Sequence, residues 1–202
     1  GAFLEHSGGA LVLAEKVLAV IGEKRITTAM GVIGYIISIP VFSDSGFILL
    51  SSLNKNLTKK AGLSLAGTTI ALGLGLSCTH ALVPPTPGPI AAAGILNADI
   101  GLVILIGLVI AAFALIPGLI FAKRVASKVF IDPNINKLPE KIEDRHLPSV
   151  LKSSSPIVIP ILLIILKSIS GFLTDSGWQL TLKNILSFLG EPVIALIIGF
   201  LF

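Results

Sequence analysis

Asp44 and His80 are the two side chains within long uncharged stretches of this sequence that could bind ions or move protons. Asp44 is the only charge between Ile26 and Asn54, and His80 lies in a run without charges over 61–98. A carboxylate near the centre of a bilayer costs about 2.5–3.5 kcal/mol on insertion scales, so its default role there is functional. An imidazole can exchange a proton near neutral pH. We therefore predict that both residues take part in substrate binding and in proton coupling.

Small polar residues and glycines surround both positions. The predicted substrate-binding set also contains Ser43, Ser45, Gly46, Thr79, Thr86 and Gly88. Hydroxyl groups can bind the carboxylate or hydroxyl oxygens of a ligand, and glycine lets a ligand approach the backbone. Two structural alternatives stay open. Asp44 could cap a helix, and His80 could donate to a backbone carbonyl that nearby prolines leave free.

The composition indicates that these residues belong to a membrane protein. Of the 202 residues, 53% are hydrophobic and 13% are charged, whereas soluble domains contain about 25% charged residues. The single cysteine, Cys78, excludes an internal disulfide and a thiolate zinc site. Soluble-enzyme motifs such as HExxH, GxSxG and the P-loop are absent from the sequence. We therefore expect a lipid bilayer as the surroundings and no catalytic residues, metal, cofactor or nucleic acid.

Charges at the segment ends predict the orientation. The uncharged segment 101–122 is long enough to cross a bilayer, and the segment 123–155 that follows is rich in lysine and arginine. By the positive-inside rule, 123–155 is a cytoplasmic loop, so 101–122 runs inward. The preceding run 61–98 begins after Lys59 and Lys60 and is expected to lead outward.

Two segments contain breaks. At about 1.5 Å per residue, 61–98 is far longer than a bilayer core of about 30 Å. Prolines at 84, 85, 87 and 89 interrupt it, which predicts a broken transmembrane helix. The segment 26–54 is too short for two crossings, is interrupted between Pro40 and Gly46, and has basic residues on both flanks. We predict a re-entrant hairpin there, with a single crossing as the alternative.

The remaining segments are assigned from their length and charge. Segment 156–173 is predicted to cross outward, and 185–202 is predicted to begin the return crossing. Residues 1–25 contain a short apolar stretch, typical of an interfacial helix or of the end of a truncated span. Lys167 is expected to extend to the membrane interface, and Glu191 to precede a helix. The predicted fold class is an all-α integral membrane protein with a re-entrant hairpin and a broken helix.

The motifs around these breaks resemble those of a known family. PVFSDSGF from Pro40, the PPTPGP motif after His80, and NADIG from Asn97 are similar to the gluconate permease family of organic-acid:proton symporters. SGGA from Ser7 and GEPV from Gly190 fit the same pattern. The sequence departs from that family at two places. Ser43 and Ser45 flank Asp44, and Glu5-His6 stands before SGG, where an aspartate is more usual.

The resemblance implies both an architecture and an activity. It implies an inverted-repeat transporter with an elevator motion, multi-pass in the bacterial inner (plasma) membrane, of which this chain is a central fragment. The implied activity is secondary active, proton-coupled uptake of a small hydroxy-carboxylate such as gluconate or glycerate. Another sugar acid or D-serine is also compatible, and the implied partners are this organic acid and protons, with room for a homodimer.

Two other functional classes remain open from the residues alone. One is an intramembrane enzyme that uses Asp44 and His80 as base and acid, and the other is a passive carboxylate channel.

Overall fold

The structure is a computed structural model, which describes residues 9–133, 149–171 and 178–201. Within these ranges it contains helices and no strand. In chain order the elements are α2 (Gly9–Ile21), η1 (Glu23–Arg25), α3 (Ile26–Ile37), α4 (Ser43–Ala61), α5 (Leu65–Leu82), α6 (Pro87–Ile95), α7 (Ile100–Arg124), η2 (Ala126–Lys128), α8 (Val150–Ser170), α9 (Trp178–Leu189) and α10 (Pro192–Leu201).

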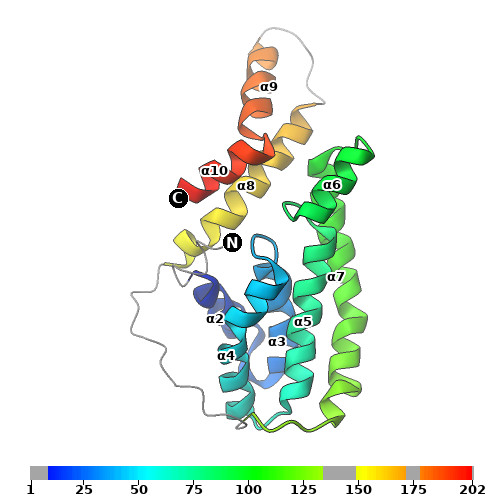
Figure 1. Ribbon diagram of the computed structural model, residues 1–202. Helices are drawn as coiled ribbons and strands as arrows, with labels where there is room; N and C mark the ends of the chain where they lie inside the picture. The colour runs from blue at the N-terminus through cyan, green and yellow to red at the C-terminus, as the bar shows by residue number, and fades with distance from the viewer. Residues whose placement is uncertain (1–8, 134–148, 172–177, 202) are drawn as a thin grey trace.

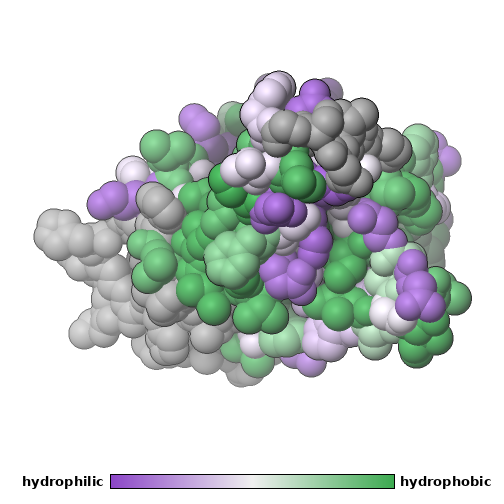
Figure 2. Space-filling model, turned by 90° about the horizontal axis from the view of Figure 1, so that it is seen from above, coloured by the Kyte–Doolittle hydropathy of each residue, from purple (hydrophilic) through white to green (hydrophobic). Residues whose placement is uncertain are grey.

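Several helices are long and apolar enough to cross a bilayer. Three qualify by length and composition among the described residues, over Leu65–Ile95, Ile100–Lys128 and Val150–Ser170, and the bent pair α9–α10 would make a fourth. The outward face of α7 exposes large apolar side chains, including Phe113 at 68%. Figure 2 shows hydrophobic side chains around hydrophilic ones near the middle of one face. Lipid, rather than water, suits such a surface, and the prediction of an all-α membrane protein is confirmed.

The helix boundaries differ from the expected segments in two places. The segment from 185, predicted to begin the return crossing, belongs to two helices that meet at an angle of 71°, and Glu191 precedes the second of them as expected. Gly190 lies between them, and Pro192, which has no amide hydrogen, begins the second. The second arm of the hairpin, α4, extends beyond Asn54 to Ala61. The first two residues of the motif at Ser7, residues 134–148 of the expected loop 123–155, and residues 172–177 lie outside the described residues.

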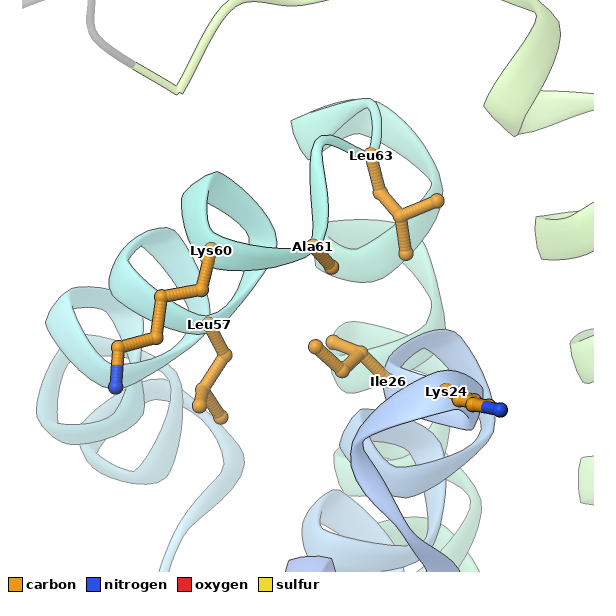
Figure 3. A pocket seen from close by; sticks show the side chains of 6 residues that line it. All are labelled: Lys24, Ile26, Leu57, Lys60, Ala61 and Leu63. Carbon is orange, nitrogen blue, oxygen red and sulfur yellow. The ribbon is translucent and has the colours of Figure 1, made fainter.

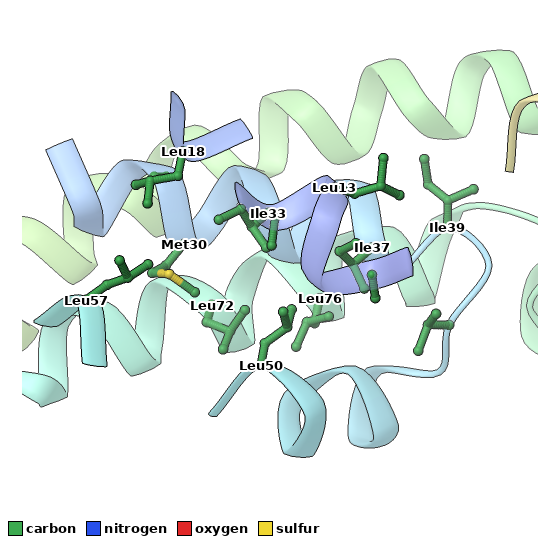
Figure 4. Packing of buried hydrophobic residues seen from close by; sticks show 14 of the residues in the cluster. Leu13, Leu18, Met30, Ile33, Ile37, Ile39, Leu50, Leu57, Leu72 and Leu76 are labelled. Atoms are coloured by element: carbon green, nitrogen blue, oxygen red, sulfur yellow. The ribbon is translucent and has the colours of Figure 1, made fainter. Parts of the chain in front are cut away.

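The principal core forms around α3, which packs against α2, α4 and α5 (Figure 4). Met30, Ile33 and Ile37 of α3 are at most 1% exposed, and they pack in one cluster with Leu72 and Leu76 of α5. α2 contributes a buried face to the same cluster. The hairpin arms are therefore held by buried apolar contacts as well as by chain connectivity.

The backbones of α3 and α5 touch. A Cβ atom added at Gly34 would lie 2.6 Å from the carbonyl oxygen of Leu72, and one added at Gly75 would collide with the carbonyl of Gly31. Membrane helices use small residues in this way, because close approach maximises van der Waals contact where lipid offers no hydrophobic driving force. α3 therefore packs directly against α5, the first half of the broken helix.

Side-chain hydrogen bonds hold α4 against α5. Asn54 donates through Nδ2 to Thr69 Oγ1 at 3.0 Å, and the hydroxyl oxygens of Thr58 and Thr68 lie 2.8 Å apart. Asn54, Thr58 and Thr68 are at most 2% exposed. Because unpaired polar groups are costly away from water, this pairing fixes the register of the two helices.

The basic ends of the helices gather at one end of the bundle. Figure 1 shows the start of α3, the end of α4 and the end of α7 together at the lower end. The turn between α4 and α5 is tied to the chain after η2, because Ser64 Oγ donates to the carbonyl of Val129 at 2.6 Å and the amide of Leu65 donates to the carbonyl of Ile131 at 3.0 Å. The hairpin therefore starts and ends on the same side as the C-terminal end of α7.

Candidate functional site

The tip segment, residues 38–46, joins the two arms of the hairpin. Ser38 donates through Oγ to the carbonyl of Val41 at 3.3 Å, which closes the turn. α4 then begins at Ser43, and its N-cap residue is Phe42, which makes no side-chain capping bond. Asp44 lies in the first turn of the helix, so it does not cap α4. The capping alternative is therefore not what the structure shows.

The predicted ligand residues of the tip segment are accessible, apart from the glycine. Asp44 is exposed, Ser43 and Ser45 are half-buried, and Gly46 is buried beside Leu76. Within the described part of the chain, the carboxylate of Asp44 has neither a hydrogen bond nor an ion pair. It is thus free to bind a ligand or a proton.

The proline break, residues 83–86, is closed by its own hydrogen bonds. The hydroxyl of Thr86 lies 2.9 Å from the carbonyl oxygen of His80 and 2.7 Å from that of Val83, and Thr86 is only 5% exposed. Thr79 is fully buried and donates to the carbonyl of Tyr35 at 2.9 Å. Both hydroxyl hydrogens are therefore used within the chain. Their role as substrate ligands stays a prediction, and so does that of the exposed Gly88.

His80 and Phe42 bring the two breaks together. Their ring centroids are 5.7 Å apart with an interplanar angle of 65°, an edge-to-face geometry that aromatic rings favour. The Nδ1 atom of His80 is buried and has no hydrogen-bond partner in the described ranges. A hydrogen on Nδ1 would be a buried donor without an acceptor within these ranges.

Phe42 is a residue that the sequence analysis missed. It is 53% exposed even though its neighbour Val41 is fully buried. The signal was a large apolar residue directly before a polar cluster, at a position where the helix needed a cap. Because its ring contacts His80, Phe42 is placed to orient the imidazole.

Both breaks lie at an intermediate level of the neighbouring helix α7. The hydroxyl of Tyr35, in the last turn of α3, donates to the carbonyl of Leu108 at 2.7 Å. The carbonyl of Leu82, the last residue of α5, lies against Gly107. At about 1.5 Å per residue, Leu108 is about 12 Å from the start of α7 and about 24 Å from its end. The breaks are therefore level with the interior of a predicted span.

The two half-helices offer different numbers of backbone donors at the breaks. In α4, the first intrahelical bond runs from the amide of Gly46 to the carbonyl of Phe42, which leaves the amides of Ser43, Asp44 and Ser45 outside the ladder. In α6, the first bond starts at Ile90, and positions 87 and 89 are prolines without amide hydrogens. An anion at the breaks can therefore gain more hydrogen bonds from α4 than from α6.

A second polar cluster joins α7, α8 and α10 at the far end of the bundle. Asp99 caps α7 by accepting from the amide of Leu102 at 2.8 Å, and it also accepts from Ser168 Oγ at 2.5 Å. Lys167 pairs with Glu191 at 2.6 Å. Partial burial raises the pKa of Asp99, but the hydrogen bonds from Ser168 and the backbone, together with the charge of Lys167, outweigh it and lower the pKa below its ordinary value. From the sequence, Lys167 and Glu191 were interpreted separately, and their pairing was not predicted.

No cluster of histidine, cysteine, aspartate or glutamate side chains suited to a metal ion occurs among the residues that the structure describes. The chemistry available at the breaks is thus that of one carboxylate, one imidazole, hydroxyls and backbone amides.

Comparisons with known proteins place the chain among permeases. A family model described as GntP family permease matches residues 1–202. Over its whole length the chain is 37% identical to a protein named "Uncharacterized permease" from Haemophilus influenzae, of which it covers 44%. It is 33% identical to a gluconate permease of Zymomonas mobilis, of which it covers 45%. It is 30% identical to the high-affinity gluconate transporter of Escherichia coli K12, of which it covers 46%.

The chain spans less than half the length of these curated relatives. No solved structure gave a significant match. The extent of the family match decides the assignment, since it covers every residue of the chain. The chain belongs to the GntP family of permeases.

Proposed function

We propose that this chain forms part of a secondary active transporter in the inner membrane of a bacterium. It takes up a small hydroxy-carboxylate such as gluconate or glycerate together with protons. The names of the relatives from Zymomonas mobilis and Escherichia coli, which specify gluconate, support this class of substrate. The family match supports transport rather than an intramembrane enzyme.

The contact between Phe42 and His80 is the observation that carries this proposal. Through it, two interrupted helices from separate parts of the sequence meet level with the interior of a span. Irregular backbone is tolerated at that depth only where it is buried in protein or lines a wet cavity. Transporters with broken helices bind anionic substrates between half-helix ends in this way.

In the proposed site, the tip segment binds the substrate. The amides at the start of α4 and the hydroxyls of Ser43 and Ser45 bind carboxylate and hydroxyl oxygens. His80 donates to the substrate through Nε2. Asp44 holds the coupled proton, because a neutral carboxyl crosses a low-dielectric barrier without an uncompensated charge. The hairpin is re-entrant, so the tip segment stays within the membrane.

Uptake by the full-length permease that contains this chain tests the proposal. In proteoliposomes with an inward proton gradient, we expect radiolabelled gluconate or glycerate to accumulate, and a protonophore to abolish the accumulation. His80→Ala should impair uptake while membrane insertion is retained. Equilibration without accumulation would instead favour a channel, and chemical change of the substrate inside the vesicles would favour an enzyme.

A further inference from the structure

A cavity of about 350 Å³ opens at the base of the hairpin, far from the two breaks. It is lined by residues that precede or begin α3 and by residues from the end of α4 onward: Lys24, Ile26, Leu57, Lys60, Ala61 and Leu63. α3 has 12 residues, which places its first residue about 16 Å from its last at about 1.5 Å per residue. The cavity is therefore separate from the candidate transport site.

The interior of this cavity is apolar and its edges are cationic. Figure 3 shows the side chains of Ile26 and Leu57 facing the space between the arms, with Lys60 and Lys24 on opposite sides. Ile26 is 2% exposed and Leu63 37% exposed. A ligand that fits would combine an apolar chain with a negatively charged head, because lysine can turn its ammonium group toward an anion while its stem covers apolar surface.

The charged residues that line the cavity are both basic. Neither Lys24 nor Lys60 makes an ion pair within the described ranges, and the basic Arg25 and Lys59 and the acidic Glu23 lie next to them in the sequence. The described lining includes no acidic residue. The end of α7, with Lys123 and Arg124 in its last turn, lies at the same end of the bundle. The positive-inside rule places this end in the cytoplasmic leaflet, where anionic lipids gather.

We propose that this cavity binds one anionic phospholipid of the cytoplasmic leaflet. The ammonium groups of Lys24 and Lys60 point away from the space between the arms (Figure 3) and turn back to contact the phosphate of the headgroup, and one acyl chain lies on Ile26, Leu57 and Leu63. Because the lining comes from both arms of the hairpin, the lipid joins the start of α3 to the end of α4. This inference does not rest on the proposed substrate or on proton coupling.

Native mass spectrometry of the full-length permease tests the lipid site. Phosphatidylglycerol and phosphatidylcholine with the same acyl chains are offered separately, and we expect retention of one phosphatidylglycerol. In the double variant Lys24→Gln, Lys60→Gln we expect about thirty-fold weaker retention, because each basic residue near an anionic lipid contributes about fivefold. Ala61→Trp keeps both lysines but fills the cavity, and should also release the lipid.

The matched control is the double variant Lys123→Gln, Arg124→Gln, which removes the same charge at the same end of the bundle but outside the cavity. We expect it to retain phosphatidylglycerol as the unmodified protein does. If this control loses phosphatidylglycerol to the same extent, the retention depends on general surface charge and the proposal is overturned. Retention by Ala61→Trp, or displacement of the lipid by inorganic phosphate alone, would also overturn it. Thermal unfolding of each variant verifies that the protein is folded.

Discussion

The two breaks of this molecule differ in where their polar groups are directed. In the proline break, the hydroxyl of Thr86 shares its one hydrogen between the carbonyls of His80 and Val83. The tip segment closes with a single side-chain bond from Ser38 and leaves Asp44 exposed without a partner in the described structure. Two interruptions that look alike in the sequence thus have different chemistry. The hydroxyl of the proline break is bonded within the chain, and only the imidazole of the neighbouring His80 remains available to a ligand. The tip segment offers most of the groups that a ligand could contact.

This contrast divides the predicted site residues into two groups. Substitutions in the tip segment should change transport with little effect on stability. Substitutions in the proline break should change stability first, because a buried carbonyl that loses its donor costs about 1–3 kcal/mol.

Asp44→Asn should abolish accumulation of substrate against its gradient. Asparagine keeps the size and much of the hydrogen bonding of aspartate but cannot carry the proton. Exchange of labelled for unlabelled substrate across the membrane should persist, because binding itself is retained. The measurement is uptake in proteoliposomes with an imposed pH gradient, with Asp44→Glu as the control that retains an acid. Accumulation by Asp44→Asn equal to that of the unmodified protein would remove Asp44 from the coupling role.

Gly75→Ala should destabilise the protein by about 1–3 kcal/mol, the usual range for overpacking. The added methyl group would collide with the backbone of Gly31, so α3 and α5 would have to separate. Gly73→Ala on the same helix is the matched control, because the nearest atom to its added Cβ lies 4.0 Å away, on Phe47. Thermal unfolding in detergent compares the two variants. If both unfold at the same temperature, the close contact does not hold the hairpin.

Thr86→Val and Ser43→Ala compare the two breaks directly. Thr86→Val removes the hydroxyl from two carbonyls and should lower the unfolding temperature, whereas Thr86→Ser keeps the donor and should restore it. Ser43→Ala should leave the unfolding temperature unchanged and raise KM about tenfold, the effect of about one lost hydrogen bond. The reverse result, a stable Thr86→Val with impaired binding, would contradict a structural role for the proline break and a binding role for the tip segment.

Asp99→Asn should show a small, pH-dependent effect at the far end of the bundle. The pKa of Asp99 lies below its ordinary value, so its stabilising contribution is complete above about pH 4. That contribution is lost as the pH falls through the lowered pKa of the folded state. We expect the variant to unfold about 1–2 °C lower than the unmodified protein at pH 6, with the difference shrinking as the pH falls below about 4. The exposed Ser51→Ala is the control, and a difference that is constant with pH would contradict the role of the charge.

The breaks themselves could be predicted from the sequence because their causes are local. The prolines after His80 end α5 and begin α6, and the glycine and polar residues after Pro40 separate α3 from α4. What could not be predicted depends on neighbours distant in sequence. The contact of His80 with Phe42 joins two helices. The pair Lys167–Glu191 joins α8 to the turn before α10, and neither partner reveals the other by spacing.

The functional prediction at Thr79 and Thr86 shows the same limit. A hydroxyl beside a proline break is equally suited to a ligand and to a free carbonyl, and only the folded backbone decides which lies nearer. Here the nearest acceptors are the carbonyls of Tyr35, His80 and Val83. Asp44 was singled out more securely, because the cost of placing a charge in an apolar segment is visible in the sequence alone.

The two hairpin arms are held against α5 by different kinds of contact, and this difference affects how each arm can move. The backbones of α3 and α5 are in direct contact, so a rotation or translation of α3 relative to α5 would bring backbone atoms into collision. α4 contacts α5 through side-chain hydrogen bonds, from Asn54 to Thr69 and between Thr58 and Thr68, rather than backbone to backbone. The first arm is therefore the more rigidly held of the two. We expect any opening of the tip segment to follow an arc of α4 and to leave α3 in place.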